Sequence, residues 1–462
     1  MAKQKKFDYD LIIIGSGAGG SVAAHIANRA GLSVALIEAD RIGGECPNIG
    51  CVPTKAILQA AEVYEAAKNG ARFGIRGTTV GYNYPSIKAW KDLAVKRTGT
   101  YLGEEMYTSE GISVINGLAH FIDAHTISVG VARFSAKKFL IATGSTLSIP
   151  PIPGLKTAGY ITYKEAINLT RPPKSLAIIG GGAIGCEFAT ALAIFGTKIY
   201  MIDSAKNLLN KEEPEASALI EDRFIEDYSM SLHLESVVDK VVKKGPKKQL
   251  TLRTKNVSST ITVDEILVST GKRGVVDIGL ENAGVEHDKT SITVNEYMQT
   301  TAPHIYAAGD CVGPYLFTHM STYQSKIATN NMLHRKNKFV ADYKAVPRCT
   351  FTSPEVAAVG PTEAELKSAK ASYKAAMVPI SVIGRANTAD FSDGFVKVLA
   401  DKKTGILLGG TVVCPHAGEV IHELALAVQH SMTAQQVADT IHAFPTWSEA
   451  LRVACAKLTK KT

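Results

Sequence analysis

The apolar and polar positions of the chain repeat one pattern in two places. Residues 11–38 and 176–203 each open with a short apolar run, pass through G-x-G-x-x-G into an alanine-rich stretch, and close with a second apolar run that ends in a carboxylate. Such a pattern predicts a strand, a helix and a second strand. The interval from the first glycine to the final acid is 23 residues in both copies. This agreement in spacing makes an accidental glycine-rich turn a poor explanation of either copy.

The glycines of the two copies have defined roles in a dinucleotide-binding fold. The first allows the tight turn off the strand, the second lets backbone amides approach a pyrophosphate, and the third lets helix and strand pack closely. In this order they are Gly15, Gly17 and Gly20 in the first copy and Gly180, Gly182 and Gly185 in the second. The helix N-terminus then offers unpaired N–H groups to the phosphates. The closing acids, Glu38 and Asp203, are placed to accept hydrogen bonds from ribose hydroxyls.

Two dinucleotide sites in one chain are typical of a flavoprotein that takes hydride from a nicotinamide, with FAD in one unit and NAD(P)H in the other. The carboxylate of Asp203 bears on the choice of nicotinamide, because it hydrogen-bonds a free 2′-hydroxyl and repels a 2′-phosphate. Residues 204–206, which follow it, contain no arginine. We therefore expect NADH rather than NADPH, with Lys206 as the residue that leaves NADPH open.

Other periodic segments predict further elements. Residues 394–413 alternate apolar and polar positions around a central turn and predict a hairpin, whereas residues 418–430 have helical spacing. The densest basic run, Lys243 to Lys248, surrounds a Gly-Pro turn between two alternating segments. We interpret it as a solvated hairpin tip rather than a nucleic-acid site, because no aromatic or arginine-rich stripe accompanies it.

Composition narrows the class of protein. With 462 residues the chain is long enough for about three domains. Hydrophobic residues make up 45% and charged residues 20%, the balance of a soluble globular protein. The apolar run near the start is four residues long, too short for a signal peptide or a membrane helix. Seven cysteines, an odd number, do not form the framework of a secreted scaffold. We expect a cytoplasmic protein without a membrane segment.

Two of the cysteines, Cys46 and Cys51, lie in the stretch GGECPNIGCVPTK at residues 43–55. They fit a structural accident, half of a metal site, or a redox pair. A zinc site would need two more ligands at suitable spacing, and no second Cys/His pair follows nearby. Pro53 suits the first turn of a helix. Cys51, just ahead of such a helix, would have a lowered thiol pKa and favour the thiolate.

Together these motifs make the chain similar to the pyridine nucleotide-disulfide oxidoreductases, and the similarity runs almost from end to end. Beyond the glycine motifs and the cysteine stretch, it rests on IATGS at 141–145, CEFA at 186–189, VSTGKR at 268–273, IYAAGDC at 305–311, FTSPEVAAVG at 351–360 and HAFPTWSEA at 442–450. The resemblance implies that the motifs also contact the cofactors through Gly44, Lys55, Thr143, Gly144, Gly271, Gly309 and Asp310.

The resemblance also implies the architecture. We expect an α/β protein with two Rossmann-like dinucleotide-binding domains, for FAD and NAD(P), and a C-terminal α+β interface domain that pairs two subunits in a homodimer. The FAD-binding domain would be interrupted by the NAD(P)-binding domain. The expected segments are residues 1–149 (FAD, first part), 150–272 (NAD(P)), 273–345 (FAD, second part) and 346–462 (interface).

By the same resemblance, Cys46 and Cys51 form a redox-active disulfide. Cys51 would contact the flavin, and Cys46 would be the outer thiol that attacks the substrate. Lys55 is expected beside the flavin, with Glu187 as its carboxylate partner, since buried charges occur in pairs.

Two positions depart from the family's pattern. Family members commonly have threonine at the position of Glu45, whose carboxylate would lie near the FAD phosphates and is expected to turn away. Members that reduce disulfides usually carry His-Pro-x-x-x-Glu near the C-terminus, with the histidine of the partner subunit acting as acid and base. Here Phe444 takes the histidine position, while Pro445 and Glu449 are retained. Phenylalanine cannot transfer a proton, and His442, two residues earlier, is the candidate substitute.

Loss of a positioned base would slow thiol exchange by about 10² to 10⁴. We therefore predict an enzyme that passes electrons from NADH through flavin and the Cys46–Cys51 disulfide to a small acceptor. A small disulfide, as in dihydrolipoamide dehydrogenase, is the first choice. A soft metal ion, as in mercuric reductase, or a quinone reduced without the disulfide are alternatives. A redox-sensing flavoprotein is the non-enzymatic alternative, against which stand two complete dinucleotide motifs.

Overall fold

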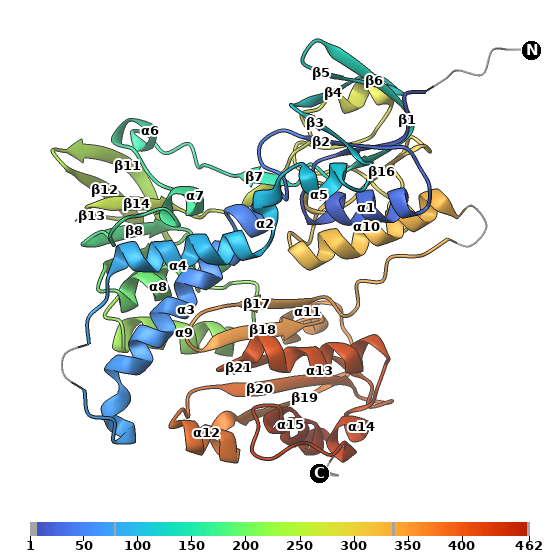
Figure 1. The fold of residues 1–462 in the computed structure, drawn as a ribbon. Helices are drawn as coiled ribbons and strands as arrows, with labels where there is room; N and C mark the ends of the chain where they lie inside the picture. The colour runs from blue at the N-terminus through green and yellow to red at the C-terminus, as the bar shows by residue number, and fades with distance from the viewer. Residues whose placement is uncertain (1–6, 78–79, 335–337, 460–462) are drawn as a thin grey trace, which may run out of the picture. The chain divides into compact units, whose positions relative to one another are not determined.

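The computed structural model describes residues 7–77, 80–334 and 338–459 (Figure 1). The chain divides into two compact units, each made from separated segments of the sequence. Unit 1 contains the described parts of Met1–Ala56, Lys88–Ile149 and Gly271–Ala341. Unit 2 contains the described parts of Ile57–Ile87, Pro150–Thr270 and Asp342–Thr462.

Unit 1 is built on a seven-stranded sheet in the order β3-β2-β1-β6-β5-β4, with β16 paired to β6. Strands β1, β2, β3, β6 and β16 run parallel, and β4 and β5 add an antiparallel edge. The strands are β1 (Tyr9–Ile14), β2 (Val34–Glu38), β3 (Ser113–Asn116), β4 (Ala119–Asp123), β5 (Thr126–Val129), β6 (Ala132–Ile141) and β16 (Ile305–Ala307). The apolar runs of β1 and β2 are buried because parallel strands are covered on both faces.

Helices and a second, small sheet complete unit 1. Helix α1 (Ala18–Arg29) follows β1 and packs beside α10 (Thr318–Leu333) (Figure 1). The short helix α2 (Glu45–Asn48) precedes α3 (Cys51–Lys68), of which only residues 51–56 belong to unit 1. Helix α4 (Tyr84–Arg97), which belongs to unit 1 from Lys88 onward, and α5 (Glu105–Thr108) follow. Strand β7 (Ser145–Leu147) pairs with β15 (Lys272–Gly274).

Unit 2 contains the second copy of the strand–helix–strand pattern. Its parallel sheet has the order β10-β9-β8-β14, and α8 (Ala183–Ile194) connects β8 to β9. The strands are β8 (Ser175–Ile179), β9 (Lys198–Ile202), β10 (Ser231–His233) and β14 (Glu265–Val268). Helices α6 (Leu155–Ala158) and α7 (Tyr163–Ala166) precede this sheet, and α9 (Pro214–Glu226) follows β9.

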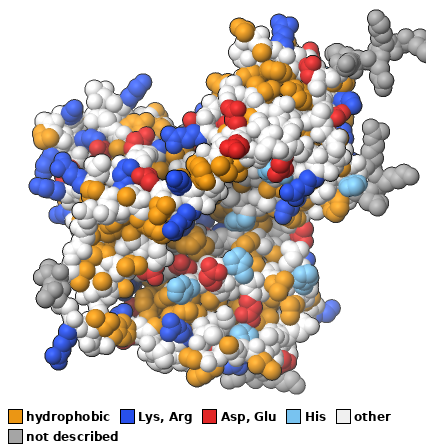
Figure 2. Space-filling model, in the orientation of Figure 1, with side chains coloured by type: hydrophobic (Ala, Val, Ile, Leu, Met, Phe, Trp, Pro, Cys, Tyr) orange, Lys and Arg blue, Asp and Glu red, His pale blue; other side chains and the backbone are white. Residues whose placement is uncertain are grey.

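The basic run lies on an antiparallel hairpin of unit 2, as predicted. Strand β11 (Ser236–Lys244) pairs with β12 (Lys247–Thr254), which pairs with β13 (Val257–Val263). Gly245 has a φ of +59° in the turn between the first two strands. Figure 2 shows Lys and Arg side chains spread over this part of the surface.

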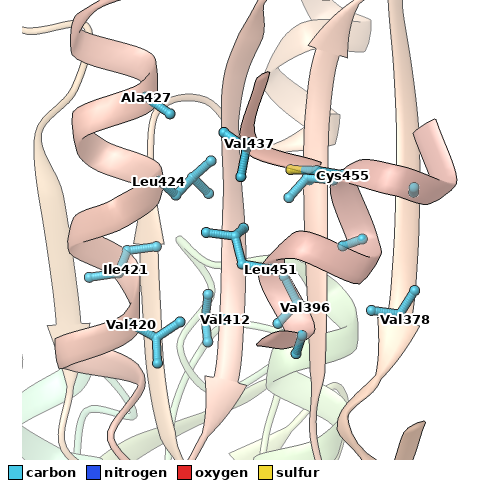
Figure 3. Close-up of a cluster of buried hydrophobic side chains, with 14 of the residues drawn as sticks. Val378, Val396, Val412, Val420, Ile421, Leu424, Ala427, Val437, Leu451 and Cys455 are labelled. Atoms are coloured by element: carbon cyan, nitrogen blue, oxygen red, sulfur yellow. The ribbon is translucent and has the colours of Figure 1, made fainter. Parts of the chain in front are cut away.

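The C-terminal part of unit 2 is a five-stranded sheet in the order β17-β18-β21-β20-β19. The predicted hairpin forms β20 (Phe395–Asp401) and β21 (Leu407–Cys414), and the predicted helix is α13 (Ala417–Gln429). The other elements are β17 (Pro347–Thr350), β18 (Glu355–Val359), α11 (Glu363–Ser368), β19 (Tyr373–Pro379), α12 (Gly384–Ala389), α14 (Ala434–Asp439) and α15 (Glu449–Thr459). Aliphatic side chains from the sheet, α13 and α15 interlock in its core (Figure 3).

The α/β architecture with two dinucleotide-binding folds is confirmed by these sheets. One local boundary differs from the sequence expectation. Helix α3 begins at Cys51 rather than near Pro53, so Cys51 itself occupies the first turn. Pro53 is then the third helical residue, where its missing N–H leaves no intrahelical bond unmade. The four-segment domain division remains a prediction. Among the described residues, none of the helices has the length and apolar character needed to span a bilayer.

Candidate functional site

The first glycine motif forms an open cradle at the carboxyl end of β1. Gly15 has a φ of +102°, and a Cβ there would lie 2.3 Å from the carbonyl oxygen of Ala142. A Cβ on Gly20 would lie 1.8 Å from the carbonyl oxygen of Gly15. Space around Gly17 is open within 4 Å, and α1 begins at the next residue. A diphosphate can therefore approach the backbone of this turn and the N-terminus of α1.

Glu38 ends β2 beside this cradle. Its Oε2 atom accepts hydrogen bonds from the Ser16 N–H (2.9 Å) and Oγ (2.6 Å), and its Oε1 atom accepts from the Asp40 N–H (2.9 Å). The carboxylate is thus held at the strand end by its own chain. Oε1 accepts only one of these bonds, so its second lone pair leaves Glu38 able to accept from a ribose hydroxyl.

The second glycine motif repeats the same geometry in unit 2. Gly180 has a φ of +109°, a Cβ on Gly185 would lie 2.1 Å from the Gly180 carbonyl oxygen, and space around Gly182 is open. The Asp203 carboxylate accepts hydrogen bonds from the Gly181 N–H (2.5 Å) and the Ala205 N–H (2.7 Å). Unit 2 therefore presents a second dinucleotide cradle that ends in a fixed carboxylate.

A glycine allows the cysteine stretch to lie directly against the first glycine motif. Gly44 has a φ of +67°, and a Cβ there would lie 2.7 Å from the Cα of Gly17. Only glycine allows this approach, and it brings α2 and the start of α3 next to the glycine motif. The sequence prediction that Gly44 belongs to the cofactor site agrees with this position.

Cys46 and Cys51 are neighbouring thiols on α2 and α3. Cys46 is half-buried, whereas Cys51 is exposed and its Sγ lies 3.5 Å from the Thr318 Oγ1. Hydrogen bonding to Cys51, together with burial, raises the pKa of the Cys46 thiol. Two adjacent thiols resist losing both protons, because the second thiolate would form beside the first.

The Glu45 carboxylate forms an ion pair with Lys272, the first residue of β15. Asp310 lies in the same electrostatic neighbourhood and accepts a 2.5 Å hydrogen bond from the Ser145 hydroxyl. Burial raises the pKa of Asp310, while Ser145 and Lys272 oppose that change. Asp310 opens the short 3-10 helix η4 (Asp310–Val312).

The other predicted cofactor residues also lie in unit 1. The Thr143 hydroxyl donates to the Val275 carbonyl oxygen (2.7 Å), and the Val275 N–H donates to the Gly144 carbonyl oxygen (3.0 Å). Gly271 accepts from the Ser148 N–H (3.0 Å), and the Gly309 N–H donates to the Gln324 side chain (2.7 Å). Unit 1 therefore brings together Gly15, Gly44, the two cysteines and Asp310.

Lys55 and Glu187 lie in different units. Lys55 is half-buried on α3. Glu187 is buried on α8 and accepts a 3.1 Å hydrogen bond from the Phe351 N–H. Their pairing remains a prediction.

The segment around Phe444 holds the predicted C-terminal residues. Phe444 is 74% exposed, and its ring edge lies against Gly384, where a Cβ would be 2.9 Å from the ring. Glu449 begins α15, and its Oε2 atom is buried with no hydrogen-bond partner among the described residues. An Arg452 guanidinium nitrogen lies 3.6 Å from the other oxygen.

His442 is held within its own unit. Its Nδ1 lies 2.8 Å from the Thr440 carbonyl oxygen, and its Nε2 lies 2.8 Å from a carboxylate oxygen of Glu423 on α13. The ring is 7% exposed. Both nitrogens are therefore occupied in this arrangement.

Comparison with known proteins now decides the family. Residues 9–331 match the family described as pyridine nucleotide-disulphide oxidoreductase, and residues 346–455 match its dimerisation domain. The chain is a pyridine nucleotide-disulphide oxidoreductase. It is 34% identical to the mercuric reductase of Lysinibacillus sphaericus, covering 98% of this chain and 83% of that protein. It is 34% identical to the dihydrolipoyl dehydrogenase of Geobacillus stearothermophilus, covering 95% and 94% respectively.

Solved structures agree with this assignment. The HOCl-induced flavoprotein disulfide reductase RclA from Escherichia coli, in a Cu(II) complex, matches with a TM-score of 0.86 and 28% identity over 98% of this chain and 99% of that chain. LpdA from Mycobacterium tuberculosis matches with a TM-score of 0.88 and 26% identity over 97% and 100%. As a member of this family, the protein is an FAD-dependent enzyme that uses NAD(P)H. Its dimerisation domain makes it a homodimer. The two glycine cradles fit these cofactors.

Three residues of this oxidoreductase escaped sequence reasoning. Lys272 stood inside a recognised motif, but nothing in its spacing linked it to Glu45. Thr318 lies beside Cys51, which is 267 residues away in the sequence. Glu423 lies beside His442, which is 19 residues away. An acidic residue on α13 is unremarkable by itself. Neither the Thr318–Cys51 contact nor the Glu423–His442 contact is therefore indicated by a local sequence pattern.

Proposed function

We propose that the enzyme is an NADH-dependent reductase of soft metal ions, which are bound and reduced at the Cys46–Cys51 pair. The observation that carries the proposal is Phe444, an exposed phenyl ring at the position where disulfide-reducing relatives have an acid-base histidine. Disulfide exchange needs a proton donor for its leaving thiolate, whereas reduction of a metal ion needs none. Thiolates are also the ligands that soft ions prefer.

The thiol pair suits this chemistry. A raised pKa keeps Cys46 protonated near neutral pH, so it is a poor spontaneous nucleophile. A soft ion displaces the thiol proton to water as it binds, because metal binding is coupled to proton release. No positioned base is required for that step. Cys51, in the first turn of α3, is the second ligand and the thiol nearer the flavin.

The remaining residues have supporting roles in the proposal. Gly15, Gly17, Gly20, Glu38, Gly44, Thr143, Gly144, Gly271, Gly309 and Asp310 hold FAD, and Gly180, Gly182, Gly185 and Asp203 hold the nicotinamide. Asp203 favours NADH because its fixed carboxylate would repel a 2′-phosphate. By the family resemblance, Lys55 is the expected cation beside the flavin and Glu187 its expected partner. Bound FAD would supply the two-electron chemistry between NADH and the Cys46–Cys51 pair.

The electron balance is simple. Oxidation of one NADH to NAD⁺ and a proton supplies two electrons, which reduce one Hg²⁺ to Hg⁰ or two Cu²⁺ to two Cu⁺. Two comparisons support a metal acceptor. Several of the similar proteins are mercuric reductases, and one similar flavoprotein disulfide reductase was solved as a Cu(II) complex.

The first test is an anaerobic NADH titration of the holoenzyme followed by visible absorbance, with wild type beside Cys51→Ser. Long-wavelength absorption at two electrons per flavin, absent in the variant, is the expected sign of a thiolate beside the flavin. Flavin bleaching without that band would place the cysteines outside the electron path and favour a quinone acceptor.

The second test compares acceptors under saturating NADH. We expect Hg²⁺ and Cu²⁺, presented as thiol complexes, to support turnover at least tenfold faster than lipoamide or glutathione disulfide. Cys46→Ser should abolish the metal-dependent rate. Faster turnover with lipoamide would overturn the metal proposal.

A small disulfide is the second candidate acceptor. It is favoured by the retained Glu449 and by the similarity to dihydrolipoyl dehydrogenases.

NADPH replaces NADH in a parallel assay to test the role of Asp203. A kcat/KM for NADPH equal to that for NADH would contradict the proposal that Asp203 selects NADH.

A further inference from the structure

The loop that follows Asp203 returns to the second glycine motif. Residues 204–209 leave the end of β9 and lead toward α9. At the far end of this 204–209 loop, the Leu209 N–H donates a hydrogen bond to the Gly181 carbonyl oxygen (2.9 Å). The Gly181 N–H donates in turn to the Asp203 carboxylate (2.5 Å). Gly181 is therefore hydrogen-bonded on both sides of the loop, to Asp203 before it and to Leu209 at its end.

Two buried leucines hold the loop in an uncommon backbone conformation. Leu208 and Leu209 are buried, and a Cβ on Gly181 would collide with a methyl group of Leu208. Leu209 has a φ of +48°, in the left-handed region that leucine rarely adopts. Such a conformation persists only where surrounding contacts stabilise it. The loop therefore depends on its contacts to stay against the glycine motif.

Glu221 on α9 supplies one of these contacts. Its Oε1 atom accepts a 2.7 Å hydrogen bond from the Leu208 N–H, 13 residues earlier in the chain. A hydrogen bond to a charged acceptor is stronger than one between neutral groups. The Glu221 side chain thus ties the 204–209 loop to a helix of the same dinucleotide-binding fold.

The charge of Glu221 also reaches the glycine motif. Cys186 lies in the first turn of α8, with its Sγ 3.3 Å from the Gly181 carbonyl oxygen. Burial raises the pKa of Cys186, and the charges of Glu187, Asp203 and Glu221 raise it further. Two effects of Glu221 must therefore be separated: its hydrogen bond to the loop and its negative charge.

We propose that Glu221 is a positioning residue for the nicotinamide dinucleotide, which acts through Asp203 by fixing this loop against Gly181. The inference rests on the proposed function of Asp203, which is to accept hydrogen bonds from the adenosine ribose. The Asp203 carboxylate is held by the N–H groups of Gly181 and Ala205, the latter within the loop. A loop released at Leu208 would no longer keep both donors in place. Asp203 would then bind ribose more weakly, although its own side chain is unchanged.

The test measures the affinity of ADP-ribose, which lacks the nicotinamide ring, for the FAD-loaded enzyme by isothermal titration calorimetry. Glu221→Asp keeps the charge on a side chain one methylene shorter, so its carboxylate no longer reaches the Leu208 N–H. Glu221→Gln keeps an oxygen acceptor at full length and removes the charge. We expect Glu221→Asp to weaken binding about three- to tenfold and Glu221→Gln to stay within about twofold of wild type. The reverse ranking, or three equal affinities, would overturn the inference.

A double-mutant cycle tests whether Glu221 acts through Asp203. In an Asp203→Ala background, Glu221→Asp should change the affinity by less than about twofold, because residues that act through one another are not additive. A full additional loss would place the effect of Glu221 elsewhere and overturn the inference. Asp222→Asn is the matched control, since Asp222 is an exposed acid at the next position of α9. Its affinity should equal that of wild type, and a loss as large as that of Glu221→Asp would also overturn the inference.

A second ligand, 2′-phospho-ADP-ribose, separates the inference from the proposed preference for NADH. Equal affinities of wild type for the two compounds would contradict that preference, whereas weaker binding of ADP-ribose by Glu221→Asp would still support the positioning role. Bound FAD per chain and thermal midpoint are recorded for each variant, so that a general loss of structure is recognised. Glu221→Gln keeps the inference testable if Glu221→Asp loses structure, since weaker binding in Glu221→Gln would by itself overturn it. The assay uses no electron acceptor, so its result does not depend on the metal reductase proposal.

Discussion

The Nε2 atom of His442 lies 2.8 Å from a carboxylate oxygen of Glu423, on the far side of the ring from the nitrogen that faces the Thr440 carbonyl. Both ring nitrogens therefore have partners within the same unit, and the ring is 7% exposed. This geometry favours a structural clamp between α13 and the Phe444 segment.

We predict that His442→Asn lowers the thermal midpoint of the protein while leaving the shape of the pH–rate profile unchanged. Loss of a general base would instead remove the acid limb of that profile and reduce turnover by about 10² to 10⁴. His422→Asn, an exposed change on α13 next to Glu423, is the control. Loss of the acid limb in His442→Asn alone would show that His442 acts as a base.

Phe444→His should create a disulfide reductase. The substitution would restore the His-Pro-x-x-x-Glu pattern that disulfide-reducing relatives usually carry, with the retained Glu449 as the expected partner of the new imidazole. We expect turnover with lipoamide to rise at least tenfold, with little change in the metal-dependent rate. Phe444→Leu, which changes the ring without adding a base, should give no gain.

Glu449→Gln provides the companion experiment. An amide cannot stabilise an imidazolium, so the double variant should lose most of the gain seen in Phe444→His. A gain that survives Glu449→Gln would mean that the new histidine works without the acid. No gain in Phe444→His would mean that the missing base is not what limits disulfide turnover.

The raised pKa of Cys46 predicts how rates depend on pH. A thiol whose pKa is raised stays protonated at neutral pH and reacts faster as pH rises, by up to about tenfold per unit. Reduction of lipoamide should therefore increase steadily from pH 6 to 9. Metal reduction should vary less, because the ion displaces the proton itself. Steady-state assays over this range would show the contrast, and equal slopes for both acceptors would contradict it.

Local patterns allowed the cofactor cradles to be predicted from sequence. Gly15, Gly20 and Glu38 occur at spacings that follow from the turn, the helix packing and the ribose contact, so each residue type reveals its role. The helix α13 was equally readable because its apolar positions have helical spacing. The hairpin of β20 and β21 was readable from its apolar runs and central turn, although nearly all residues of both strands are buried. These features depend on neighbours within about 30 residues.

Contacts between distant segments could not be predicted in this way. Glu45 meets Lys272 across more than two hundred residues, and nothing about an isolated glutamate indicates which cation it will find. The expectation that Glu45 turns away from the cofactor was a statement about repulsion alone, whereas the structure supplies an attractive partner. The prediction of a helix that begins around Pro53 is correct to within two residues, since proline marks a first turn but does not fix which residue opens it.

Lys397 on β20 is a buried cation surrounded by acids. Its amine lies 2.8 Å from Glu213, 2.9 Å from Glu215 and 2.8 Å from Glu363, and its side chain is 4% exposed. These three carboxylates have the spacing of a metal site, but the lysine amine already contacts each of them. Burial acts to lower the pKa of Lys397, and the three acids raise it. Lys397→Met would leave the buried Glu213 carboxylate without its counter-charge beside two partly exposed acids, at a cost of about 3–5 kcal/mol of folding free energy.

Trp447 offers a reporter for this change, because the chain has two tryptophans and Trp447 lies in the core of the C-terminal sheet. In a Trp90→Phe background, urea unfolding followed by fluorescence should show a much lower midpoint for Lys397→Met. Lys367→Met is the control, since Lys367 also pairs with Glu363 but is 66% exposed and should cost less than about 1 kcal/mol. Equal midpoints for the two variants would contradict the prediction.

Acid should weaken the same cluster in a defined range. Hydrogen bonds from Lys397 and Lys367 lower the pKa of Glu363 to about 2 from an ordinary value of 4.5. Because the folded-state pKa is the lower one, the folded protein holds fewer protons than the unfolded chain between these values. The stabilisation is complete above pH 4.5 and is lost as pH falls toward 2.

Urea midpoints at pH 6, 4.5 and 3 should therefore fall less steeply in Lys397→Met than in its parent, because the main cause of the lowered Glu363 pKa is gone. Parallel slopes in the two proteins would assign the acid sensitivity to other carboxylates.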